Sequence, residues 1–178
     1  MALTLDSETI QTHAEKYLKE GMTDDEEEKL VSLPAKFREG TVEWDDYLWI
    51  ITWKSGGRAQ PYFERNDHEY VDHVIGLVLR DIPASWKIRH LSTLHGVKVP
   101  TASSFLAFMD PERYTVMDYR AWSVLHSCGV LREPPASEYR AADYAEYLRV
   151  CRDVSDDYEV ELRTLDRALF TMYDGLSD

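Results

Sequence analysis

Apolar residues recur every three or four positions along most of the chain, which is the spacing of an amphipathic helix. Between residues 6 and 20 this apolar stripe includes Ile10, Ala14 and Tyr17. Further helices are predicted for residues 24–32, 41–55, 66–80, 83–94, 100–109, 118–129 and 137–154, and for a last segment with the stripe Tyr158, Leu162, Leu165, Leu169 and Met172. Because no stretch alternates convincingly with the period of two that a strand requires, the sequence predicts an all-α fold.

Residues at the ends of these segments support the helix boundaries. Thr23 followed by Glu26 has the pattern of a capping box, and Asp118 precedes the helix that ends near Gly129. A chain of 178 residues is long enough to bury one substantial core without disulfides or metal ions. We therefore expect one compact multi-helix domain over residues 1–178.

Composition excludes several classes of protein. No apolar run approaches the ~20 residues that span a bilayer, and the first residues have neither the basic start nor the apolar stretch of a signal peptide. The two cysteines, Cys128 and Cys151, are too few for a four-thiolate cluster, and the histidines lack the i, i+4 spacing of a shared metal site. We expect a cytoplasmic protein without membrane association, metal or cofactor.

The formal net charge of −13 repels a polyanion at long range. A nucleic-acid partner would therefore require a local basic patch that acts against the field of the whole molecule. Composition alone does not separate this case from a protein partner.

The segment from Leu94 to Trp122 carries the most specific signal. Its sequence predicts two helices joined by a tight turn at Gly96-Val97-Lys98, within a helix-hairpin-helix motif over about residues 86–109. A glycine in such a turn lets backbone amides approach a phosphate at the start of the second helix. We expect the hairpin from Gly96 to Thr101 to be exposed, with Asp118 starting a helix beside it.

This segment resembles the HhH-GPD superfamily of DNA glycosylases over about 30 residues. The matching positions are Leu94, Gly96, Val97, Thr101, Ala102 and Asp118. The superfamily places its catalytic aspartate at the same distance after the hairpin as Asp118, and residues 162–169 look like its small uncharacterised stand-alone members. The resemblance implies a compact, all-helical glycosylase-like fold, with DNA contacts from Gly96, Val97, Lys98 and Thr101. Arg120 is a further candidate for a phosphate contact, from its charge.

Two departures from the superfamily pattern narrow the expected chemistry. Lys98 replaces the second hairpin glycine and supplies a cation that can reach the same phosphate. Pro100 occupies the position where bifunctional members carry a Schiff-base lysine, so no amine is available there for attack on the sugar. A lyase is not expected.

Cleavage of a base from its sugar develops positive charge on the sugar ring, which an ionised carboxylate stabilises. Asp118 suits this role, although an aspartate at this position also serves as a plain helix cap. Trp53 and Trp122 are candidates for a base pocket, and Lys54 for a side chain that fills the gap left by a flipped base. Core packing is the alternative for both tryptophans.

These residues leave two main hypotheses. The first is a monofunctional base-excision enzyme that hydrolyses an N-glycosidic bond with Asp118 and water. The second is a binding module that keeps the scaffold without catalysis and recognises nucleic acid or a protein. A purely structural hairpin in a protein-binding helical module is a third, more remote, hypothesis.

Overall fold

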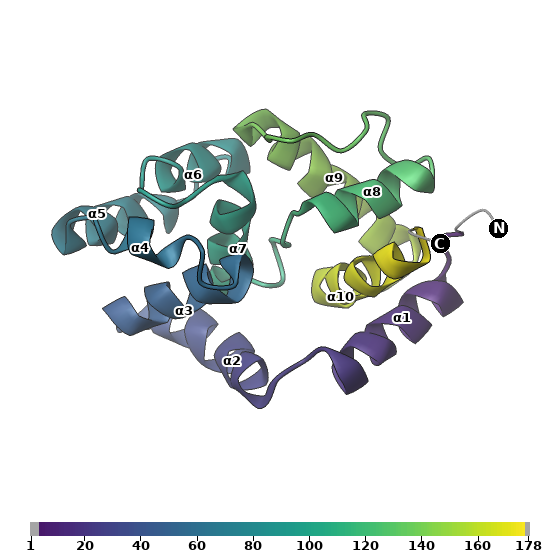
Figure 1. Cartoon of the computed structure of the whole chain (residues 1–178), viewed down its shortest axis with the longest axis horizontal. Helices are drawn as coiled ribbons and strands as arrows, with labels where there is room; N and C mark the ends of the chain where they lie inside the picture. Colours follow the sequence, from purple (N-terminus) through teal and green to yellow (C-terminus); the bar gives the residue numbers. More distant parts are fainter. Residues whose placement is uncertain (1–3, 177–178) are drawn as a thin grey trace.

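The computed structural model describes residues 4–176, which form ten α-helices and one 3₁₀ helix with no strand among them (Figure 1). The predicted all-α class is confirmed. The helices are α1 (Ser7–Glu20), α2 (Asp24–Glu39), α3 (Trp44–Ser55), α4 (Gln60–Phe63), α5 (His68–Val78), α6 (Ala84–Leu91), α7 (Val99–Met109), α8 (Tyr119–Ser127), α9 (Ala141–Asp157), α10 (Leu162–Met172) and η1 (Tyr173–Leu176). In the described part of the chain, none of them has the length and apolar composition to cross a membrane.

The helices form two groups that face each other (Figure 1). Helices α2 to α7 make the first group, here called the hairpin group. Helices α1, α8, α9 and α10 make the second, here called the terminal group, in which α1 lies along α10. Contacts between α6 and α9 join the two groups. The first and last helices of the chain are thus direct neighbours.

Helix α7 lies at the centre of the hairpin group. Every residue from Thr101 to Met109 is buried, so the polar side chains of this helix must find partners inside the protein. Ser103 Oγ donates to the Pro100 carbonyl and accepts from the Met117 amide at 2.9 Å. This second bond holds the chain between α7 and α8 against the central helix.

Three predicted boundaries differ from the structure by four residues or more. The acidic helix runs through Pro34 to Glu39 because Leu33, Pro34 and Phe37 bury an apolar face that offsets the missing proline amide. Helix α9 starts at Ala141 rather than Ser137. Tyr158 ends α9 instead of starting the last helix, and its hydroxyl donates to the Leu5 carbonyl at 2.7 Å.

The turn between α6 and α7 is packed against α4, a short helix that the apolar pattern did not predict. Gly96 has a φ of +79°, and a Cβ there would lie 2.8 Å from the Ala59 carbonyl oxygen and 2.9 Å from the Phe63 amide nitrogen. Val97 and Thr101 are buried. The expectation of an exposed hairpin is therefore wrong for most of its residues, because α4 covers the turn; Lys98 is exposed.

A buried lysine closes the end of α5. Lys87, which is 5% exposed, donates to the carbonyl oxygens of Val78 and Arg80. Its ammonium also lies 5.6 Å from the centroid of the Tyr114 ring. These contacts satisfy carbonyls that the last turn of a helix otherwise leaves without partners.

Candidate functional site

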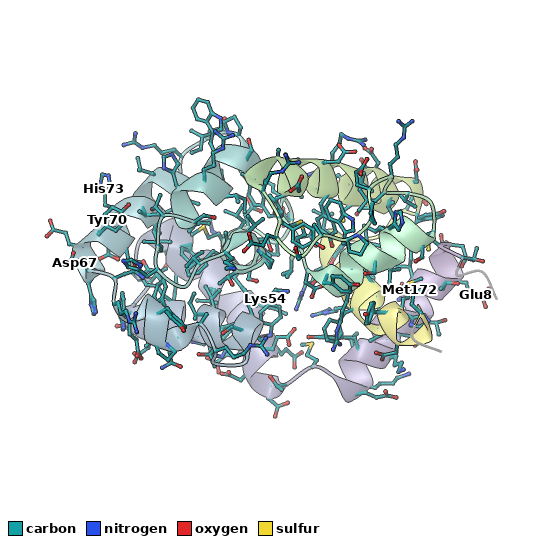
Figure 2. The ribbon with its side chains drawn as sticks, turned by 45° about the horizontal axis from the view of Figure 1, so that its top comes forward. Glu8, Lys54, Asp67, Tyr70, His73 and Met172 are labelled. Carbon is teal, nitrogen blue, oxygen red and sulfur yellow. The ribbon has the colours of Figure 1, made fainter. Side chains whose placement is uncertain are left out.

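Asp118 and Lys54 meet between the two helix groups. Asp118 is the N-cap of α8, and its Oδ1 accepts the Ala121 amide at 2.9 Å, so its predicted capping role is confirmed. Its Oδ2 accepts from Lys54 Nζ at 3.0 Å. Lys54 lies in the last turn of α3 and near the middle of the molecule in Figure 2. Residues 64 positions apart, both predicted from the sequence as site residues, are thus brought into direct contact.

The surroundings of Asp118 favour its ionised form. Burial by itself would raise the pKa of the carboxyl, but the Lys54 charge and the amides of Ala121 and Arg120 outweigh it, and the pKa is lowered. The side chain is still 24% exposed, against 12% for Lys54. Asp118 is therefore an anion at neutral pH that solvent can reach.

A second cluster of charges lies deeper, between α2 and α10. Arg163 forms ion pairs with Glu26, at 2.5 Å, and with Asp166. Burial raises the pKa of Asp166, against the opposing charge of Arg163, and the negative charge of Asp118 raises it further. We call Glu26, Arg163 and Asp166 the Arg163 network. Because the charges of Asp118 and Lys54 both act on the pKa of Asp166, the two clusters are electrostatically coupled.

Trp53 contacts the Arg163 network. Its Nε1 donates to Glu26 Oε2 at 3.1 Å, and the guanidinium of Arg163 lies 5.5 Å from its ring centroid. Phe108 packs edge-to-face against the ring at 5.0 Å. Tyr17 also donates to Glu26, at 2.9 Å. The Nε1–H of Trp53 and much of its ring surface, next to Lys54, are therefore occupied by contacts within the protein.

Trp122 lies in the core of the terminal group. It is 4% exposed, and its Nε1 donates to the Glu133 carbonyl at 2.9 Å. Tyr147 stacks on it at 5.9 Å and Tyr139 contacts it at 5.1 Å. A base would find no free ring surface there.

The predicted DNA-contact residues do not form one patch. Gly96, Val97 and Thr101 are packed within the hairpin group, as described above. Lys98 is exposed and pairs with Glu138 at 3.0 Å. Arg120 belongs to α8, in the terminal group, where its guanidinium lies over the ring of Phe170.

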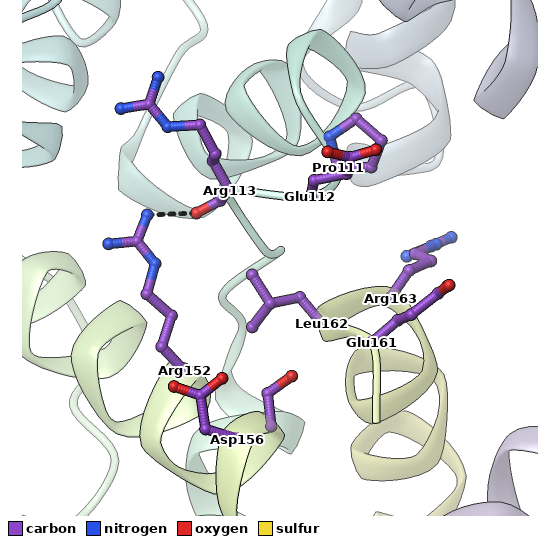
Figure 3. Close-up of a pocket in the computed structure, with 9 residues that line it drawn as sticks. Pro111, Glu112, Arg113, Arg152, Asp156, Glu161, Leu162 and Arg163 are labelled. Carbon is purple, nitrogen blue, oxygen red and sulfur yellow. Dashed lines mark hydrogen bonds between the residues drawn. The ribbon is translucent and has the colours of Figure 1, made fainter. Parts of the chain in front are cut away.

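An open pocket of about 780 Å³ lies between the loop after α7, the end of α9 and the start of α10 (Figure 3). Leu162 and Asp156 line it, together with Arg113, Arg152 and Arg163. Arg152 donates to the Arg113 carbonyl, and the Arg113 guanidinium points away from the cavity. The pocket includes neither Asp118 nor Lys54, and Arg163 is the residue that it shares with the Arg163 network.

The Arg163 network was not predicted from the sequence, although residues 162–169 were part of the resemblance. A signal was present in the helical spacing. Asp166 falls on the same face of α10 as Leu162 and Leu169, the apolar stripe that the pattern assigns to the core. A charged residue at a core position requires a buried partner, which here is Arg163.

Comparison of the chain with models of protein families, with curated proteins and with solved structures finds no match. The resemblance to helix-hairpin-helix glycosylases therefore stays an expectation from the sequence. Within residues 4–176, no group of three or more histidine, cysteine, aspartate or glutamate side chains is arranged to hold a metal ion.

Proposed function

We propose that this protein hydrolyses the N-glycosidic bond of a base in nucleic acid, with Asp118 as the group that stabilises the positively charged sugar. The observation that supports the proposal is an ionised carboxylate, held at the start of α8 by an amide and by Lys54, that is still accessible to solvent. A fixed anion of this kind lowers the barrier to a reaction in which positive charge develops beside it.

The proposed reaction requires no cofactor. The bond between the anomeric carbon and the base nitrogen breaks, and its electron pair leaves with the base. A water oxygen bonds to the same carbon and loses a proton, which passes through Asp118 to solvent, and the departing base takes up a proton from solvent. Lys54 acts as a positioning residue, since its contact with Oδ2 limits rotation of the carboxylate. Pro100 provides no amine, so the product is an intact strand with an abasic site.

A binding module without catalysis is the second candidate, and two observations favour it. Lys54 neutralises much of the Asp118 charge, and Gly96 is used to accommodate α4 rather than left open to a phosphate. In such a module the Lys54–Asp118 pair would only join the two helix groups.

The deciding experiment compares base release by the parent and by Asp118→Asn. Oligonucleotides with damaged or undamaged bases are incubated with each protein, and abasic sites are revealed by alkaline cleavage. On a true substrate we expect a fall of about 10²–10³-fold, the usual effect of removing one well-placed electrostatic group. Asparagine keeps an oxygen that can cap α8, so the fold should be retained.

Asp67→Asn is the matched control. Asp67 caps α5 through the Tyr70 amide at 3.0 Å in the same way, but lies at the far end of the hairpin group (Figure 2). Its variant should release bases at the parental rate. Equal rates for Asp118→Asn and the parent, or no release by the parent on any substrate, would refute the proposal and leave the binding module.

A further inference from the structure

Aromatic rings gather on the terminal group, and one of them, Tyr119, directly follows Asp118 in the chain. Tyr119 is 51% exposed and Phe170, near the end of α10, is 38% exposed. Tyr173 meets the Tyr119 ring edge to face, with 6.2 Å between centroids. We call these three residues, together with Arg120, the aromatic platform. Apolar rings left in water next to a candidate site are suited to a planar ligand.

Arg120 adds a positive charge to the platform. Its guanidinium carbon lies 4.8 Å from the Phe170 centroid and 5.6 Å from the Tyr173 centroid. Among residues 4–176 no carboxylate pairs with it. In a chain of net charge −13, an exposed guanidinium that forms no ion pair is available to an external anion.

We propose that the aromatic platform binds an unpaired nucleotide of single-stranded DNA, with the base stacked on Tyr119 and the phosphate at Arg120. A nucleotide joins a planar ring to an anion, and these are the two features that the platform complements. The choice of a DNA strand as the ligand rests on the proposed function. An enzyme that removes a base from the stack leaves its neighbour without a stacking partner, and Tyr119 directly follows Asp118 at the start of α8.

The test measures binding rather than base release, so it does not depend on the catalytic proposal. The full chain is titrated into a short, undamaged, fluorescently labelled single strand at low salt, and anisotropy is recorded. Tyr119→Leu keeps apolar bulk but removes the ring, and should weaken binding about fivefold or more. Arg120→Gln should weaken it too, and should lower the slope of log affinity against log salt by roughly 0.7.

Two matched variants control for exposure and charge. Tyr70→Leu removes a tyrosine of similar exposure, 45%, on α5, at the end of the molecule away from Met172 of α10 (Figure 2). Arg149→Gln removes an exposed arginine of α9 whose carboxylate partners are Glu146 and Asp153. Neither should weaken binding. Thermal unfolding of all four variants should match the parent, because the substituted side chains lie at the surface.

Three outcomes would overturn the proposal: no binding of the single strand by the parent, equal losses in the platform and control variants, or equal affinity for a free mononucleotide. The catalytic proposal fails separately. Platform-dependent binding without base release on any substrate would support the platform and refute the hydrolase. Base release with no effect of Tyr119→Leu on binding would support the hydrolase and refute the platform.

Discussion

Removal of the Arg163 guanidinium should be among the most damaging single changes to this protein. Arg163 is the cation between Glu26 and Asp166, and the three side chains are only 12%, 3% and 12% exposed. Arg163→Met keeps most of the side-chain volume and leaves both carboxylates buried without their partner. Breaking a buried ion pair in this way costs about 3–5 kcal/mol, a large share of the 5–15 kcal/mol typical of a whole domain.

Urea unfolding followed by tryptophan fluorescence measures this loss. With a dependence on urea of about 2 kcal/mol per molar, the midpoint should fall by about 1.5–2.5 M. Arg149→Met is the matched control, because Arg149 also contacts two carboxylates, Glu146 and Asp153, but at the surface. Exposed pairs contribute about 0–1 kcal/mol. Equal shifts for the two variants would refute the view that burial makes the Arg163 network different.

The effect should also depend on pH, with a defined sign. Burial raises the pKa of Asp166 in the folded protein, and Arg163 opposes that rise, so Arg163→Met raises this pKa further. A carboxyl with a raised folded pKa stabilises the fold below its unfolded pKa, and this stabilisation is lost as the pH rises through the folded pKa. The deficit of the variant should therefore be smaller near pH 4 than at pH 7. A deficit that grows on acidification would contradict the assignment.

Three other predictions concern the fold. Gly96→Ala should lower the free energy of unfolding, measured in urea, clearly more than Gly57→Ala. Both glycines have a positive φ, which costs an alanine roughly 1–2 kcal/mol, but only a Cβ at Gly96 would meet backbone atoms. Lys87→Met should lower stability by about 1–3 kcal/mol, because buried carbonyls at the end of α5 lose their donor. Asp46→Asn should reduce the dependence of stability on pH below about 4. Burial raises the pKa of Asp46, but its hydrogen bonds to two lysines outweigh burial, and the pKa is lowered. The stabilisation that the Asp46 carboxylate provides is therefore lost as the pH falls.

Helix positions were largely predictable from the sequence because they depend on local signals. Asp118 caps the helix that it was expected to start, Asp67 caps the helix predicted from residue 66, and the left-handed Gly56 follows the end of α3. Such residues act on amides and carbonyls within a few positions, so their effect is present in the pattern itself. The short helix α4 has too few residues for an apolar stripe to be recognised.

Contacts between distant segments were less predictable. The resemblance suggested both Lys54 and Asp118 as site residues, but nothing in the periodicity indicated that Lys54 Nζ would contact Asp118 Oδ2. Gly96 was expected to approach a phosphate and instead approaches the backbone of α4. In both cases the role of the residue depends on what another element places against it, and one sequence without the fold does not contain that information.

The pairing of α1 with α10 determines when the protein can complete its fold during synthesis. The apolar side chains Ile10 and Ala14 of α1 are buried, and the carbonyl of His13 accepts from Thr171, 158 residues later in the chain. At the usual translation rate of ~5–20 residues per second, α1 waits several seconds or more on the ribosome before α10 exists. During that time its apolar face has no native partner, so a chain that stalls before α10 exposes a surface suited to chaperones and to aggregation.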